Sequence, residues 1–392
     1  MMAVWKEMTV GDLCDSISDT YRRNDNEVIL VNTSDVLEGK VLNHQCVENK
    51  NLKGQFKKTF QKDDILYSEI RPANKRYAYI DFDDTEQYIA STKLMVLRPK
   101  KEIILPRFLF AFLSSNHVLM ELQHLAETRS GTFPQITFSS ELAPMLISVP
   151  DFATQEKTVG ILNSIEERIQ NNNAINENLY EQLTSYYKHL FSAITPSTSV
   201  GELVDSIFSG GTPSTSNEAY WNGDHYWLSS GETSERFIVS TIKTITDAGA
   251  SNSSTRKANK YDIVIASAGQ GHTRGQTSML LTDTYVNQSI IVVHAAPDYL
   301  PYLFWNIANR YEELRVISNS NSIRGSLTTK MIGSLSIPKA DITQIRQFSD
   351  YAWPIVKAVE NNLHENRRLA VMRDTLLPRL MSGELDVSAL DL

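Results

Sequence analysis

The chain of 392 residues has little cysteine and no long apolar run. Its two cysteines, Cys14 and Cys46, cannot build a disulfide framework, and neither has a partner at CxxC spacing. No apolar stretch reaches the ~18 residues that cross a bilayer, and the richest one, 103–113, is interrupted by proline and arginine. The N-terminus also lacks the basic-then-apolar pattern of a secretory signal. These absences predict a cytoplasmic protein.

Motifs for catalysis are missing as well. The sequence contains no GxxxxGK[ST] phosphate loop, no HExxH zinc motif and no Asn/Asp-Pro-Pro-aromatic motif of amino-methyltransferases. The eight histidines are scattered, and none has a cysteine or carboxylate at metal-ligand spacing. We therefore predict no catalytic residue, no metal site and no cofactor bound by this chain itself.

The charge balance is acidic, with 38 Lys and Arg against 46 Asp and Glu, a formal net charge of −8. This balance argues against a protein that coats nucleic acid through bulk charge, but it leaves room for a local basic face. A content of 41% hydrophobic residues excludes a wholly disordered chain. The length suggests two or three domains.

The chain is an internal duplication with an offset of about 190 residues. MTVGDLCDSISD at 8–19 recurs as TSVGELVDSIFS at 198–209, and LISVP at 146–150 recurs as SLSIP at 334–338. Short β-rich runs with turn residues fill the first part of each repeat, and a nearly Gly-free helical segment follows. The predicted fold class is α/β (α+β), with a globular domain at 1–150, a helix at 151–194, a second domain at 195–338 and a helix with the tail at 339–392.

The two helical segments carry apolar residues spaced alternately four and three apart, which is typical of a coiled-coil seam. We expect the helices to pair antiparallel with pseudo-twofold symmetry. The predicted seam is Ile165, Ile169, Asn172, Asn176, Leu179 and Leu183 in the first helix, and Ile355, Val359, Asn362, Asn366, Leu369 and Leu376 in the second.

Asparagine occupies two matching seam positions in each helix, and two interpretations are open. Buried asparagines would fix the register of the pair at a cost in stability. Alternatively they face solvent and the apolar stripe lies one residue over, at Leu363. Pro378 near the end of the second helix predicts a kink or a restart near Leu377, because a helix interior resists proline.

Basic residues cluster in the first domain, and such clusters suit contacts to DNA phosphates. The alternative is a solvated lysine-rich surface. In the second domain the candidates are polar side chains that can bond base edges, or else ordinary loop residues. The predicted DNA-contacting residues are Lys57, Lys58, Arg71, Lys75, Arg76, Thr92, Lys93, Arg129, Thr212, Ser229, Ser230, Gln270, His272, Arg274, Asn287, Gln288 and Arg324.

Several segments together resemble the specificity subunit of type I restriction-modification systems. NRRLAVMRDTLLPRLMSGELDV at 366–387 is similar to that family's conserved helix end. GELVDSIFSGGTPST at 201–215 and YDIVIASAGQGHTRG at 261–275 are similar to its target recognition domain. The first repeat departs from the GGTPS pattern, since Asp19-Thr20-Tyr21-Arg22 stands in that place.

The resemblance implies a division of labour. Each domain would read one half of a bipartite, asymmetric site in double-stranded DNA. The paired helices would set the spacer and dock two modification subunits, and restriction subunits would join the complex. S-adenosylmethionine, ATP and Mg would be bound by those partners.

Two alternative functions predict different activities. A self-contained DNA-modifying enzyme would methylate or cut DNA alone, which the missing motifs disfavour. A coiled-coil adaptor that binds only proteins would show no sequence-selective DNA binding, which the resemblance disfavours.

Overall fold

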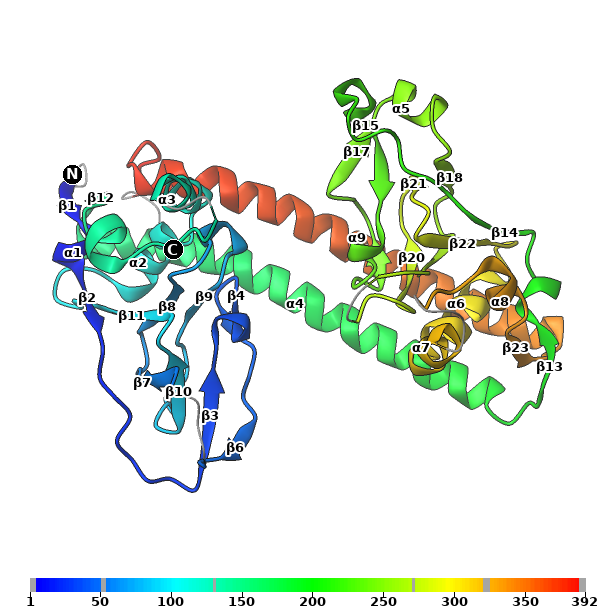
Figure 1. Ribbon diagram of the computed structural model, residues 1–392, viewed down its shortest axis with the longest axis horizontal. Helices are drawn as coiled ribbons and strands as arrows, with labels where there is room; N and C mark the ends of the chain where they lie inside the picture. Colours follow the sequence, from blue (N-terminus) through cyan, green and yellow to red (C-terminus); the bar gives the residue numbers. More distant parts are fainter. Residues whose placement is uncertain (1–4, 51–53, 130–131, 270–271, 320–324, 388–392) are drawn as a thin grey trace. The chain divides into compact units, whose positions relative to one another are not determined.

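A computed structural model gives the fold of the chain (Figure 1). The structure describes residues 5–50, 54–129, 132–269, 272–319 and 325–387. The chain forms two compact units, which we call unit 1 (residues 1–169 and 368–392) and unit 2 (residues 170–367). Each unit is rich in sheet, and parts of two long helices belong to each. The predicted mixed α/β class is therefore confirmed.

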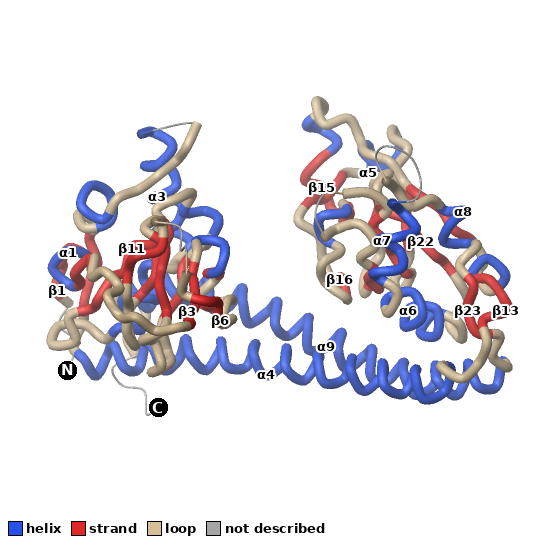
Figure 2. The backbone as a smooth tube through the Cα atoms, turned by 60° about the horizontal axis from the view of Figure 1, so that its bottom comes forward, coloured by secondary structure: helices blue, strands red, loops and turns tan. Residues whose placement is uncertain are grey.

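Unit 1 contains two four-stranded sheets (Figure 2). The first has the order β2 (Cys14–Ile17), β11 (Leu94–Pro99), β8 (Ile65–Ser68) and β9 (Tyr77–Tyr79), with every neighbour antiparallel. The second has the order β6 (Cys46–Glu48), β3 (Glu27–Val31), β10 (Tyr88–Ser91) and β7 (Phe56–Lys58). Two-stranded pairs are β1 (Lys6–Thr9) with β12 (Leu146–Val149), and β4 (Val36–Leu37) with β5 (Lys40–Val41).

Unit 2 repeats this plan. One sheet has the order β14 (Ser206–Ser209), β22 (Ile290–His294), β19 (Ile263–Ala266), β20 (Thr277–Leu280) and β16 (Phe237–Ile238). The other has the order β17 (Lys243–Ile245), β15 (Trp221–Leu228), β21 (Thr284–Val286) and β18 (Arg256–Ala258). A short pair joins β13 (Pro196–Ser199) to β23 (Ser336–Pro338).

The pairing directions also repeat, which confirms the internal duplication. The central pair of the second sheet is parallel in both units, β3 with β10 and β15 with β21. The flanking strands are antiparallel in both units, β6 and β7 in one, β17 and β18 in the other. The parallel pair lies at the same place in two sheets of the same strand order, which indicates that one ancestral fold was duplicated.

Short helices connect and cover the strands. Those of unit 1 are α1 (Val10–Leu13), α2 (Pro106–Leu113), α3 (Asn116–Arg129), the 3-10 turns η1 (Thr33–Asp35) and η2 (Pro72–Asn74), and the π-helical turn η3 (Phe138–Leu142). Those of unit 2 are α5 (Asp247–Ser251), α6 (Leu300–Ala308), α7 (Tyr311–Asn319), α8 (Thr329–Gly333), η4 (Val200–Glu202), η5 (Glu218–Tyr220) and η6 (Ser230–Glu232).

Strand β8 lies in the middle of the core of unit 1, and both of its faces are buried. Ile65 and Tyr67 point to the side covered by α2 and α3, where they pack with Phe108. Leu66 points to the other side and packs against the second sheet. This two-sided burial explains why the strand reads as a continuous apolar run rather than an alternating one.

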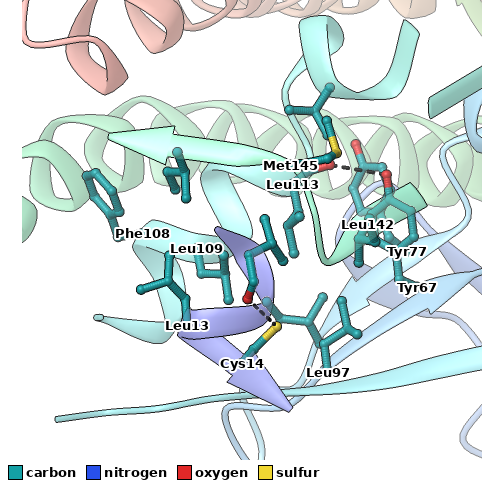
Figure 3. Packing of buried hydrophobic residues seen from close by; sticks show 14 of the residues in the cluster. Leu13, Cys14, Tyr67, Tyr77, Leu97, Phe108, Leu109, Leu113, Leu142 and Met145 are labelled. Atoms are coloured by element: carbon teal, nitrogen blue, oxygen red, sulfur yellow. Dashed lines mark hydrogen bonds between the residues drawn. The ribbon is translucent and has the colours of Figure 1, made fainter. Parts of the chain in front are cut away.

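The two cysteines differ in their surroundings. Cys14 is buried in the cluster of Figure 3, where its thiol donates to the Val10 carbonyl at 3.4 Å, and Cys46 is exposed. Burial raises the pKa of the Cys14 thiol to about 12. Because the thiolate is the nucleophile, iodoacetamide at about pH 8 is expected to label Cys46 alone in the native protein and both cysteines after unfolding. Mass spectrometry of the labelled peptides tests this, and native labelling of Cys14 would contradict it.

The long helices are α4 (Phe152–Phe191) and α9 (Ile342–Met381). The Asp341 side chain accepts from the Thr343 amide at 2.7 Å and so caps the start of α9. Beyond its end, Gly383 has a φ of +75°, as expected of a helix stop. Of the two alternatives predicted near Leu377, a kink or a restart, the restart is wrong. The helix continues through Pro378, whose carbonyl accepts from the Ser382 amide at 3.0 Å.

Within each unit, α4 and α9 run antiparallel. In unit 1, Arg373 bonds Glu166 at 3.1 Å, and Leu162 shares a cluster with Leu377 and Leu380. In unit 2, Leu183 and Phe348 lie in a common core. None of the twelve predicted seam residues is exposed.

The seam asparagines of unit 2 contact one another. Asn172, only 1% exposed, donates to Asn366 at 2.9 Å, and Asn362 donates to Asn176 at 2.8 Å. A shift of 190 residues exchanges the two pairs, so the contact is symmetric under the duplication. These amide contacts form in only one alignment of the helices, which supports the interpretation that the asparagines fix the register.

Candidate nucleic-acid interface

Three loop segments meet at one edge of unit 1, and we call this place loop junction 1 (residues 69–71, 92–93 and 133–137). The Glu69 amide donates to the Lys93 carbonyl at 3.0 Å, and the Ile136 amide donates to the Glu69 carbonyl at 2.8 Å. The Arg71 amide reaches the Pro134 carbonyl at 3.1 Å. These backbone bonds join segments that are far apart in the sequence into one rigid surface.

Unit 2 has the same arrangement, loop junction 2 (residues 267–269, 287–289 and 325–327). The Ser267 amide donates to the Ser289 carbonyl at 2.8 Å, and the Leu327 amide donates to the Ser267 carbonyl at 2.9 Å. The strands that lead into it, β19 and β21, correspond to β8 and β10 of unit 1. The duplication has therefore preserved the backbone of the junction.

Four of the predicted DNA-contacting residues lie at or beside loop junction 1. They are Arg71, Thr92, Lys93 and Arg129. Lys93 bonds the Glu69 carboxylate at 3.4 Å, and Arg129, at the end of α3, bonds Glu141 at 3.1 Å. Arg71 is exposed and has a left-handed backbone with a φ of 46°. Such strained non-glycine residues often occur at functional sites.

The other basic residues predicted in unit 1 lie away from this junction or are already bonded. The Lys58 ammonium is half-buried and donates to the Leu94 carbonyl at 2.8 Å, and burial lowers its pKa. Arg76 donates to the Ser34 carbonyl at 3.0 Å. Lys75 pairs with Glu38 at 3.1 Å. Lys57 is exposed on β7. Only Lys57 among these four presents a simple solvated charge.

In unit 2 the predicted residues separate into two groups. Thr212 donates to the Gln288 side chain at 2.6 Å at loop junction 2, beside buried Asn287. Ser229 bonds Glu232 at 3.2 Å and caps η6, to which Ser230 also belongs. Asn287 is tied to the same region, because its amide donates to the Leu228 carbonyl at 3.1 Å.

Arg274 and His272 have internal partners instead. The Arg274 guanidinium donates to the Gly325 carbonyl at 3.0 Å and also bonds Asn319. The His272 carbonyl accepts from the Tyr311 hydroxyl at 2.6 Å. Arg274 thus holds the junction together rather than extending from it. Gln270 and Arg324 lie outside the described residues.

Two glycines explain the GGTPS pattern of the second repeat. A Cβ at Gly210 would lie 1.9 Å from the Val286 carbonyl oxygen, and a Cβ at Gly211 would lie 1.9 Å from the Ser254 hydroxyl. The chain passes so close to β21 here that only glycine fits. The two glycines of the pattern therefore have a structural role: they let the chain pass close to β21 and so place Thr212 at loop junction 2.

Two residues of loop junction 1, Phe133 and Gln135, were not predicted from the sequence. Together with Arg129 and Thr137 they line a pocket of about 190 Å³. Phe133 is 46% exposed, which is unusual for a large aromatic side chain. No basic run marks this segment, and only the Phe-Pro-Gln sequence after α3 could have drawn attention to it.

The described part of the chain contains no group of three His, Cys, Asp or Glu residues that could hold a metal ion. In the same part of the chain, no helix has both the length and the apolar character that a membrane span requires.

Comparison with known proteins adds the family. The model of the type I restriction modification DNA specificity domain matches residues 2–181. The HindI specificity subunit of Haemophilus influenzae is 28% identical over an alignment of 467 positions, which covers 98% of this chain and 100% of that protein. The chain is therefore similar to the specificity subunits of type I restriction-modification systems along nearly its whole length.

A solved structure agrees with the fold of this chain. The S subunit of a type I system from M. genitalium superposes with a TM-score of 0.55 at 16% identity, covering 97% of this chain and 96% of that one. The family model matches the first repeat and its helix. Because the second repeat has the same strand order in its four-stranded sheet and an equivalent loop junction, the fold that this model matches is present twice in the chain.

Proposed function

We propose that the chain is the specificity subunit of a type I restriction-modification system, and that each unit reads one half of a bipartite, asymmetric site in double-stranded DNA through its loop junction. One observation carries the proposal: the two junctions share two backbone hydrogen bonds, those donated by the amides of Glu69 and Ile136 in unit 1 and of Ser267 and Leu327 in unit 2, but not their side chains. Glu69, Lys93 and Gln135 stand in unit 1 where Ser267, Ser289 and Ser326 stand in unit 2. Different donors and acceptors on one scaffold suit two different base sequences.

The partners follow from the same duplication. The paired helices would dock two modification subunits, because each repeat supplies one long helix. Exposed apolar side chains on these helices suit protein contacts: Ile175 on α4, and Val371 and Met372 on α9. Restriction subunits would complete the complex. S-adenosylmethionine, ATP and Mg would be bound by the modification and restriction subunits.

Sequencing of adenine methylation in cells tests the proposed function. With the modification subunit present, the specificity subunit is expected to produce methylation at one bipartite motif with a fixed spacer. Deletion of the specificity subunit should abolish that motif completely, because the modification subunit alone has no sequence reader. Unchanged methylation after deletion would contradict the proposal, and methylation by the isolated chain would indicate an enzyme instead.

A further inference from the structure

Lys93 and Gln135 form a side-chain pair at the centre of loop junction 1. The Lys93 ammonium donates to the Gln135 side-chain oxygen at 3.1 Å. An ammonium group has only donors, so the Gln135 amide must turn its oxygen toward Lys93. Its NH₂ group is then directed away from Lys93, and the pair presents hydrogen-bond donors rather than acceptors.

The backbone holds this pair in place from both sides. Gln135 forms an isolated antiparallel bridge with Ile70, and its neighbours Pro134 and Ile136 bond Arg71 and Glu69. The Lys93 carbonyl accepts from the Glu69 amide, and the Glu69 carboxylate, at 3.4 Å, also holds its ammonium. A reader held this firmly loses little conformational freedom when it binds.

We propose that Lys93 and Gln135 together read a guanine in the half-site of unit 1. This inference rests on the proposed function. In the major groove guanine presents two adjacent acceptors, N7 and O6, which match two adjacent donors. Adenine presents its N6 amino donor where guanine presents O6, and the Lys93 ammonium, which has no lone pair, cannot accept from it. Cytosine presents a donor there and finds no acceptor on this pair.

At the two corresponding positions of loop junction 2, both of them described, serines stand in place of Lys93 and Gln135, so the reading is specific to one half-site. Ser326 takes the place of Gln135 there. The residue after each makes the equivalent backbone bond: the Ile136 amide donates to the Glu69 carbonyl, and the Leu327 amide donates to the Ser267 carbonyl. A change at Gln135 is therefore expected to alter one position of the motif and to leave the other half-site unchanged.

The test is the variant Q135E, expressed with the modification subunit and assayed by sequencing of methylated adenines. Glutamate keeps the shape of the side chain and its bond to Lys93 but replaces the amide donor by an acceptor. We expect the preference for guanine at one position to fall about tenfold or more. All other positions and the spacer should remain as in the wild type.

Q87E is the matched control. Gln87 is exposed and precedes β10, the strand whose far end leads to Lys93, so the same charge change occurs away from the junction. Its motif should equal that of the wild type. An unchanged motif in Q135E, a change at a position other than guanine, or a uniform fall in methylation would each overturn the inference. Absence of any bipartite motif in the wild type would instead refute the proposed function.

Discussion

Insertion of one heptad into α4 after Gln170 and of one into α9 after Arg367 is expected to move the methylated half-sites apart. Seven residues lengthen a helix by ~10.5 Å, which corresponds to at most about three base pairs of 3.4 Å. The insertion points face each other in the antiparallel pairing, because Asn172 contacts Asn366 just beyond them. A full heptad keeps the seam in phase. Sequencing of methylated adenines would measure the new spacer.

The control for this experiment inserts the same heptad into α4 only. One lengthened helix cannot match its partner on both sides of the insertion. The amide pairs of unit 2 and the helix contacts of unit 1, such as that between Arg373 and Glu166, could then not form together, and the variant should lose methylation altogether. A double insertion that methylates the original motif with the original spacer would show that the helices do not set the spacing. A motif with altered half-sites would show that the units do not read independently.

The architecture could be predicted from the sequence because its causes are local. The duplication appears as identical short segments, and the long helices appear as apolar residues at coiled-coil spacing. The asparagines of the seam also occupy matching positions in both repeats. What periodicity cannot give is the partner of each amide. Whether Asn172 faces Asn366 or solvent depends on packing in three dimensions.

The DNA interface could be predicted only in part, for the same reason. Lys58 and Arg76 belong to a basic cluster in the sequence, yet backbone carbonyls of other strands and loops bind them. Arg274 similarly serves the fold. Gln135 has no distinguishing neighbour in the sequence, and its relevance comes from Lys93, 42 positions earlier. A basic residue in the sequence shows that a DNA contact is possible, but the fold determines whether its side chain is free to make that contact.

Arg98→Ala is expected to destabilise unit 1 by about 3 kcal/mol. Asp64 precedes β8 and is 1% exposed, and the Arg98 guanidinium donates to its two oxygens at 2.9 and 2.8 Å. Removal of Arg98 leaves a buried carboxylate whose remaining partner is the Gln61 amide at 2.9 Å. The cost is that of an unpaired buried charge. Hydrogen exchange of the β8 and β11 amides would measure it within unit 1.

The matched control removes both charges, as Asp64→Leu with Arg98→Leu. Replacing a whole buried pair by apolar groups is often nearly neutral, so this double variant should recover most of the loss. β8 leads directly into loop junction 1. When the temperature is raised, Arg98→Ala should therefore lose recognition of the half-site of unit 1 at a lower temperature than recognition of the half-site of unit 2. Exchange rates in β19 and β20 of unit 2 should stay unchanged. A loss below about 1 kcal/mol, or equal loosening of both units, would show that this ion pair does not hold the recognition scaffold of unit 1.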